Sequence, residues 1–264
     1  MTDIIIRALV VGILVSLCSS LLGVPLVLKR YSMIGDGLSH VAFGAMSVAL
    51  ALNAAPLPVA LPIVVLSAVL LLRMGEKTKI RGDAAIALIA GTSLAIGVIA
   101  ARLSGGTNID INSYMFGSIW GVEKGDLYLC VPLAAIVLIC FAVFYNIIFA
   151  VTFDENFASA RGLNVGAYNM LLALLTALTV VVGMRLVGTL LISSLIIFPS
   201  ISAMRVLKSF KGVILCAGIL SVVCFSVGIF VTYLVDIPTG AGIVVVNAVM
   251  FFLFSLYGKF VKIH

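Results

Sequence analysis

Residues 212–235 read GVILCAGILSVVCFSVGIFVTYLV, a run of 24 residues without a charged side chain. A helix needs about 20 apolar residues to cross the hydrocarbon layer of a membrane. Eight further apolar runs flank this segment along the chain: 5–28, 33–53, 56–73, 83–101, 127–151, 167–184, 186–204 and 238–258. The pattern predicts an all-α, polytopic integral membrane protein with about eight or nine transmembrane helices in one bundle. The count is open at 186–204, which only Arg185 separates from the preceding run, so this run is either a ninth span or a re-entrant segment.

The composition agrees with this class. Hydrophobic residues make up 63% of the chain and charged residues 10%, and the mean hydropathy is +1.33. A soluble domain of 264 residues does not need so much apolar surface. We therefore expect residues 1–264 to form a single transmembrane domain in contact with the lipid bilayer. The net charge of +6 does not indicate a nucleic-acid partner, because the basic residues lie at the ends of the apolar runs.

The basic residues also predict the topology. Loops that follow the first, third, fifth, seventh and ninth runs hold 12 of the 16 Lys and Arg residues: Lys29, Arg30, Arg73, Lys77, Lys79, Arg81, Arg161, Arg205, Lys208, Lys211, Lys259 and Lys262. Cytoplasmic loops carry an excess of such residues. The C-terminus is therefore expected in the cytoplasm and, with nine spans, the N-terminus outside.

Asp36 and His40 are the first candidate site. The chain has ten acidic residues and two histidines, and these two residues lie four positions apart in an apolar run. That spacing places both side chains on one face of a helix. Ionisable residues inside a membrane mark functional sites, and carboxylate and imidazole are ligands of zinc and similar divalent metals. The pair predicts a metal site, although Asp36 as a helix cap and His40 as a buried, hydrogen-bonded residue are open alternatives.

The second candidate is the segment 152–166, which is predicted to be cytoplasmic. It contains Asp154 and Glu155 near its start, then Arg161 and Gly162, an order that suits a short surface helix with a glycine at its end. The chain has no phosphate-binding loop, no nucleophile elbow and no His-Glu-x-x-His motif. Energy for transport must therefore come from a partner or a coupled ion. The segment is either a partner's binding site or only a connector.

Several stretches resemble one family in order and spacing. Residues 30–44, RYSMIGDGLSHVAFG, resemble the signature of the membrane permeases of zinc and manganese ABC importers. Residues 113–119 resemble the outer segment of that family, and residues 153–162 resemble its cytoplasmic coupling loop. Residues 183–199 and 238–241 resemble its last two blocks. The resemblance covers essentially the whole chain.

The family resemblance implies an assembly and a set of roles. It implies a homodimeric permease that joins two cytoplasmic ABC ATPase subunits and receives its ion from an extracytoplasmic metal-binding protein. It implies that Asp36 and His40 contact the metal. Residues of the loop that we expect to couple the permease to the ATPase are Phe153, Asp154, Glu155, Phe157, Ala158, Arg161 and Gly162. Among these, we expect the two acids to be solvated and Phe153, Phe157 and Ala158 to contact the ATPase.

We therefore expect a permease subunit of the bacterial cytoplasmic membrane that imports divalent transition metal ions, with zinc favoured and manganese possible. It would hold no permanent cofactor, and a separate chain would hydrolyse ATP. One alternative is an ABC permease for a metal chelate or corrinoid, and another is an ion-coupled secondary carrier. A third is an intramembrane enzyme that uses His40 as a base. The residues do not decide between zinc and manganese, because both metals accept carboxylate and imidazole ligands.

Overall fold

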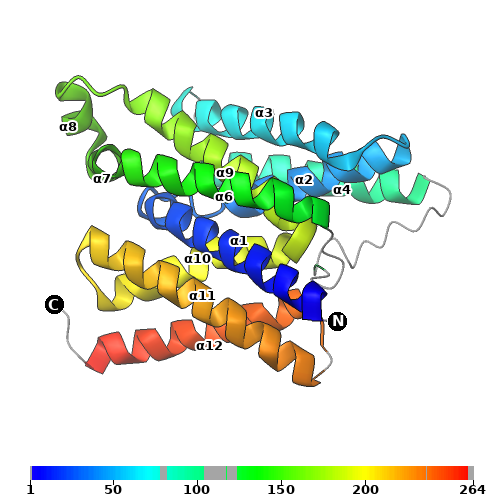
Figure 1. Ribbon diagram of the computed structural model, residues 1–264. Coiled ribbons are helices and arrows are strands. Elements are labelled where there is room, and N and C mark those ends of the chain that lie inside the picture. Colours follow the sequence, from blue (N-terminus) through cyan, green and yellow to red (C-terminus); the bar gives the residue numbers. More distant parts are fainter. Residues whose placement is uncertain (1, 78–81, 104–116, 118–123, 236, 261–264) are drawn as a thin grey trace.

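The computed structural model describes residues 2–77, 82–103, 117, 124–235 and 237–260, which form a bundle of helices (Figure 1). Within these ranges the chain contains no strand. The helices are α1 (Thr2–Leu28), α2 (Ile34–Ala51), α3 (Pro56–Lys77), α4 (Gly82–Leu103), α6 (Lys124–Val143), α7 (Tyr145–Phe153), α8 (Glu155–Ala160), α9 (Val165–Val187), α10 (Thr189–Val206), α11 (Phe210–Val235) and α12 (Thr239–Phe260). The resembling outer segment 113–119 lies outside the described residues except for Gly117.

The number of spans agrees with the expectation of eight or nine. In the described part of the chain, α1–α4 and α9–α12 are each long and apolar enough to cross a membrane. Helices α6 and α7 add a ninth span if the pair is counted as one, with a bend of 69° between them. The irregular span is therefore the pair α6 and α7, and not the run 186–204 that was suspected from the sequence. The run 186–204 forms α10, which a break at Gly188 (φ 86°) separates from α9.

The bend between α6 and α7 is accompanied by a cluster of aromatic rings. The ring of Phe210, the first residue of α11, lies 5.7 Å from Tyr145, 5.2 Å from Phe149 and 5.8 Å from Phe153, measured between centroids. Aromatic pairs at such distances contribute about 0.5–1.5 kcal/mol each beyond the area they bury. The cluster holds α7 against the start of α11 and thereby fixes the position of α8, which follows directly.

Helices α1 and α2 lie at the centre of the packing. Helix α1 packs against α6, α9, α10 and α11, whereas α2 packs against α3, α4, α9 and α10. The start of α1 and the end of α12 lie at opposite ends of the bundle, and the α1–α2 turn, α8 and the α10–α11 turn lie at the end where α12 finishes (Figure 1). These connections hold many of the basic residues. One end of the bundle therefore concentrates positive charge, as a nine-span topology with a cytoplasmic C-terminus requires.

Small residues bring α2 and α4 close together. A Cβ atom on Gly44 would lie 2.5 Å from the backbone oxygen of Ser93, and one on Gly97 would lie 2.9 Å from Cα of Gly44. Helices in lipid associate largely through such close backbone contacts, because the lipid itself is apolar. Gly44 and Gly97 therefore serve the packing of α2 against α4.

Candidate functional site

Asp36 and His40 lie on one face of α2, as their spacing predicts. The Oδ2 atom of Asp36 and the Nε2 atom of His40 are 3.7 Å apart, and the two side chains are 35% and 22% exposed, respectively. This distance is too long for a good hydrogen bond. Two ligand atoms that are each about 2.1 Å from a zinc ion in tetrahedral geometry lie about 3.4 Å from each other. A small side-chain adjustment would therefore let both groups bind one ion.

The alternative roles considered for these two residues do not match the structure. Helix α2 begins at Ile34 after Met33 as the N-cap, so Asp36 lies inside the first turn and does not cap the helix. The Nδ1 atom of His40 is buried and has no hydrogen-bond partner within the described residues. The Nε2 atom is the ring nitrogen that faces Asp36.

The glycines on either side of Asp36 allow close packing of the first turn of α2. A Cβ atom on Gly35 would lie 2.5 Å from the Cδ1 atom of Ile196 in α10. A Cβ atom on Gly37 would lie 2.6 Å from the Cγ2 atom of Ile86 in α4. Contacts with α10 and α4 thus hold the backbone on both sides of Asp36.

An open groove adjoins Asp36 and lies between α2, α10 and α12. Its lining includes the N-cap residue Met33 and Asp36 of α2, Ser193 and Ser194 from α10, and Val244 from α12. The two serine hydroxyls donate to backbone carbonyls one turn earlier in α10, at 3.1 and 3.0 Å. Their oxygen lone pairs therefore remain available to an ion or to water. The place of these two serines in the groove was not predicted from the sequence, although two consecutive serines in an apolar run were a usable signal.

If a metal ion binds here, one copy of the chain supplies only part of its ligands. Among the described residues there is no group of three or more His, Cys, Asp or Glu side chains placed to hold a metal ion. Asp36 and His40 would thus provide two ligands. A transport site should bind its ion weakly enough to release it, so an incomplete ligand set suits passage better than storage.

The segment 152–166 contains the short helix that its sequence suggests. Helix α8 spans Glu155–Ala160 and lies between α7 and α9 (Figure 1). The Oδ1 atom of Asp154 accepts a hydrogen bond from the backbone N–H of Phe157 at 2.9 Å, and so caps the helix. Gly162 has a φ of 81°, and the N–H groups of Gly162 and Leu163 donate back to carbonyls of the helix. This is the Schellman pattern of helix termination.

The side chains around α8 divide into exposed and buried groups. Phe153 and Phe157 are 58% and 55% exposed, whereas Ala158 is fully buried. The guanidinium carbon of Arg161 lies 5.7 Å from the centroid of the Phe157 ring. Ala158 therefore faces the interior of the chain's own fold, which differs from the expectation that it contacts a partner. Phe153 and Phe157 are the accessible apolar groups.

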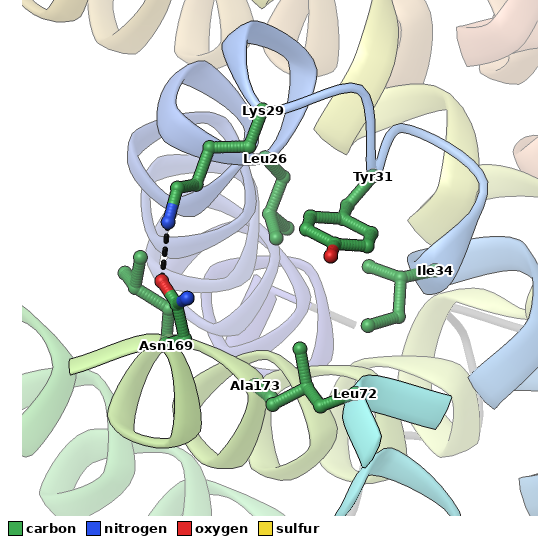
Figure 2. Close-up of a pocket in the computed structure, with 8 residues that line it drawn as sticks. Leu26, Lys29, Tyr31, Ile34, Leu72, Asn169 and Ala173 are labelled. Atoms are coloured by element: carbon green, nitrogen blue, oxygen red, sulfur yellow. Dashed lines mark hydrogen bonds between the residues drawn. The ribbon is translucent and has the colours of Figure 1, made fainter. Parts of the chain in front are cut away.

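Glu155 is not simply solvated as expected, because it belongs to a polar cluster with Lys29 and Asn169. The Nζ atom of Lys29 lies 2.7 Å from Oε1 of Glu155, and Nδ2 of Asn169 donates to the same oxygen at 3.2 Å. Lys29 also donates to Oδ1 of Asn169 (Figure 2). The side chain of Lys29 is only 6% exposed, whereas that of Glu155 is 52% exposed.

This cluster shifts the titration of Glu155. Partial burial opposes its ionisation, but the hydrogen bonds from Lys29 and Asn169 and the charge of Lys29 outweigh that effect and lower the pKa of the carboxyl. Lys29 was visible in the sequence only as a charge that orients the chain. Asn169 lies 140 residues away from it, so no local pattern joined the two.

Comparisons with known proteins cover nearly the whole chain. A family model described as the ABC 3 transport family matches residues 1–258. The high-affinity zinc uptake system membrane protein ZnuB of Haemophilus influenzae is 28% identical over 98% of this chain and 99% of its own length. The manganese import system permease protein ScaB of Streptococcus gordonii is 26% identical over 93% of this chain and 88% of its own. The solved structure of PsaBC from Streptococcus pneumoniae in complex with Fab has a similar chain, with a TM-score of 0.86 and 25% identity over 98% of this chain and 95% of that one.

Proposed function

Because the chain belongs to the ABC 3 transport family, we propose that it is the permease subunit of an ATP-driven importer that passes divalent transition metal ions into the cytoplasm. Membership in this family accounts for a multi-pass protein of the bacterial plasma membrane. It also separates the chain from secondary carriers and from intramembrane enzymes. The names of relatives include zinc, manganese and iron, which supports a divalent transition metal without ranking the three. We keep zinc as the favoured ion and manganese as the second choice, because both accept carboxylate and imidazole ligands.

The observation that carries this proposal is the pair Asp36 and His40, of which Asp36 lines the groove. His40 lies six residues into α2, or roughly 9 Å along the helix axis at about 1.5 Å per residue. The pair thus lies inside a segment that is otherwise apolar. A carboxylate and an imidazole suit zinc or manganese and are too hard for copper(I). A second copy of the chain, related by a two-fold axis, would supply an equal pair and complete a mixed nitrogen–oxygen ligand set.

Energy in this proposal reaches the permease at α8. The chain lacks a phosphate-binding loop, so ATP hydrolysis belongs to partner subunits at the positively charged, cytoplasmic end of the bundle. Phe153 precedes α8 and Phe157 lies within it. Their exposed rings offer an apolar contact to those subunits. An extracytoplasmic binding protein would deliver the ion at the opposite end. Alternating access would then carry the ion past Asp36 and His40.

Metal uptake by cells that carry single substitutions tests the metal site. Asp36→Asn and His40→Ala should each reduce uptake of radiolabelled zinc or manganese by at least tenfold, because each removes one of two ligands. Ser39→Ala is the matched control. Its hydroxyl donates to the backbone carbonyl of Asp36 at 2.7 Å and does not line the groove, so uptake should stay near the wild-type rate.

Membrane insertion of each variant is checked by its yield and elution profile in detergent. Near-normal uptake by the double variant with both substitutions would refute the metal site. The preferred ion follows from competition in the wild-type importer. Excess unlabelled zinc should suppress manganese uptake more strongly than excess manganese suppresses zinc uptake, and the reverse order would make manganese the main substrate.

A further inference from the structure

Lys29 is a buried cation at a junction of three helices. It follows the last residue of α1, and its side chain reaches Glu155 at the start of α8 and Asn169 in the first turns of α9. Figure 2 shows the Lys29 side chain directed at Asn169. A lysine with 6% of its side chain exposed must keep its partners, because an unpaired buried charge is strongly unfavourable. The three side chains therefore form one unit.

The backbone around Lys29 leads directly into α2, the helix that carries Asp36 and His40. The N–H groups of Arg30 and Tyr31 donate to the carbonyls of Val27 and Leu26, at 3.1 and 2.8 Å, in a Schellman pattern with Arg30 in the left-handed region (φ 63°). The chain turns sharply there. Helix α2 begins at Ile34, and Asp36 follows in its first turn.

Apolar contacts close the turn onto the same junction. Leu26, Tyr31, Ile34, Leu72 and Ala173 line one small cavity together with Lys29 and Asn169. In Figure 2 the ring of Tyr31 lies between Leu26 and Ile34, and the side chains of α3 and α9 lie below them. The start of α2 is thus packed on the helices that hold the polar cluster.

We infer that Lys29 is a positioning residue that joins α8 to the start of α2, so that a displacement of α8 moves Asp36. This inference rests on the proposed function, in which a partner ATPase acts on α8. Glu155 is the outer member of the cluster and Lys29 the inner one, so the ion pair connects an accessible helix with a buried turn. Because Lys29 cannot lose its partners readily, α8 and the α1–α2 turn move as one body.

The test uses the complete importer, with its ATPase subunits, in lipid vesicles, and measures metal uptake and ATP hydrolysis on the same sample. Lys29→Met removes the charge but keeps an unbranched apolar stem. We expect it to lower the number of ions imported per ATP hydrolysed at least tenfold, while basal hydrolysis stays within twofold of wild type. Lys29→Arg should restore most of the ratio. Arg30→Met, which removes the adjacent exposed cation, is the matched control and should keep the wild-type ratio.

A double-mutant cycle with Glu155→Gln examines the pair itself. The double variant should import no fewer ions per ATP hydrolysed than Lys29→Met alone, because the two residues act through one contact. An unchanged ratio in Lys29→Met would refute the inference, as would a parallel fall of uptake and hydrolysis. If Lys29→Met does not insert normally, the ratio in Glu155→Gln decides in the same way. Absence of metal uptake by the wild-type importer would instead refute the proposed function.

Discussion

Gly44→Ala should loosen the contact between α2 and α4, on which the position of Asp36 and His40 depends. The added Cβ atom would lie 2.5 Å from the backbone oxygen of Ser93, 3.1 Å from its carbonyl carbon and 3.5 Å from its Cα atom. Ordinary contacts of a Cβ atom begin near 3.4 Å. The obstacle is backbone within a helix, so it cannot rotate away as the end of a side chain can. One helix must shift by about 0.9 Å to restore normal contact.

Overpacking of a well-packed core destabilises a protein by about 1–3 kcal/mol. A helical Ala is favoured over Gly by up to about 1 kcal/mol, which offsets part of this loss. We therefore expect a net loss of about 1–2 kcal/mol for Gly44→Ala. At about 2–4 °C for each kcal/mol, the apparent Tm should fall by about 2–8 °C. Uptake should fall as well, because α2 carries Asp36 and His40.

The assay is thermal unfolding of the purified protein in detergent, followed by size-exclusion chromatography of the heated samples. Gly91→Ala in α4 is the matched control, because a Cβ atom there has no neighbour within 4 Å. Its Tm should equal or slightly exceed that of the wild type. Equal Tm values for Gly44→Ala and the wild type would refute the argument, since they would show that α2 and α4 separate without loss.

Two further predictions concern the α1–α2 turn and the polar cluster. Arg30→Gly should be more stable than Arg30→Ala by about 1 kcal/mol, because only the glycine relieves the left-handed conformation at φ 63°; equal Tm values would contradict this. The pKa of Glu155 lies below its ordinary 4.5, so its stabilising pairing is complete above that pH and is lost as the pH falls through the lower value. Between pH 3 and 6, the free energies of unfolding of the wild type and Glu155→Gln should differ by less than about 1 kcal/mol, because Glu155 is half exposed. This difference should disappear at the acid end of the range.

The sequence was sufficient for features that depend on local periodicity. The apolar runs located the spans, and the four-residue spacing of Asp36 and His40 placed both on one face of α2, where the structure has them. Asp154 and Gly162 likewise indicated the short helix α8, because capping acts within a few residues. In each of these cases the decisive interactions lie within about one helical turn.

Features that depend on tertiary contacts were not predictable in this way. Lys29 and Asn169 meet across 140 residues of sequence. Ala158 is buried by the chain's own fold, although it lies in a polar segment. Helix ends were also obscured. Helices α1 and α2 end with Arg30 and Asn53 in the left-handed region, where glycine is the usual signal. The bend at Phe144 is accompanied by aromatic contacts of α7 with Phe210, which belongs to a helix far away in the sequence.

The structure explains how a membrane protein accommodates Asp36 and His40 at all. Among the eight helices identified as candidate spans, α2 has the lowest hydropathy, 1.3, and the largest buried share of its most apolar window, 72%. Helices α3 and α4, which pack against it, have shares of only 28% and 22% and therefore lie on the outside of the bundle. Polar residues in a membrane are tolerated where protein rather than lipid surrounds them. Because α2 is enclosed so completely, its polar face meets the groove beside α10 and α12, and any movement of that face must involve the helices around it.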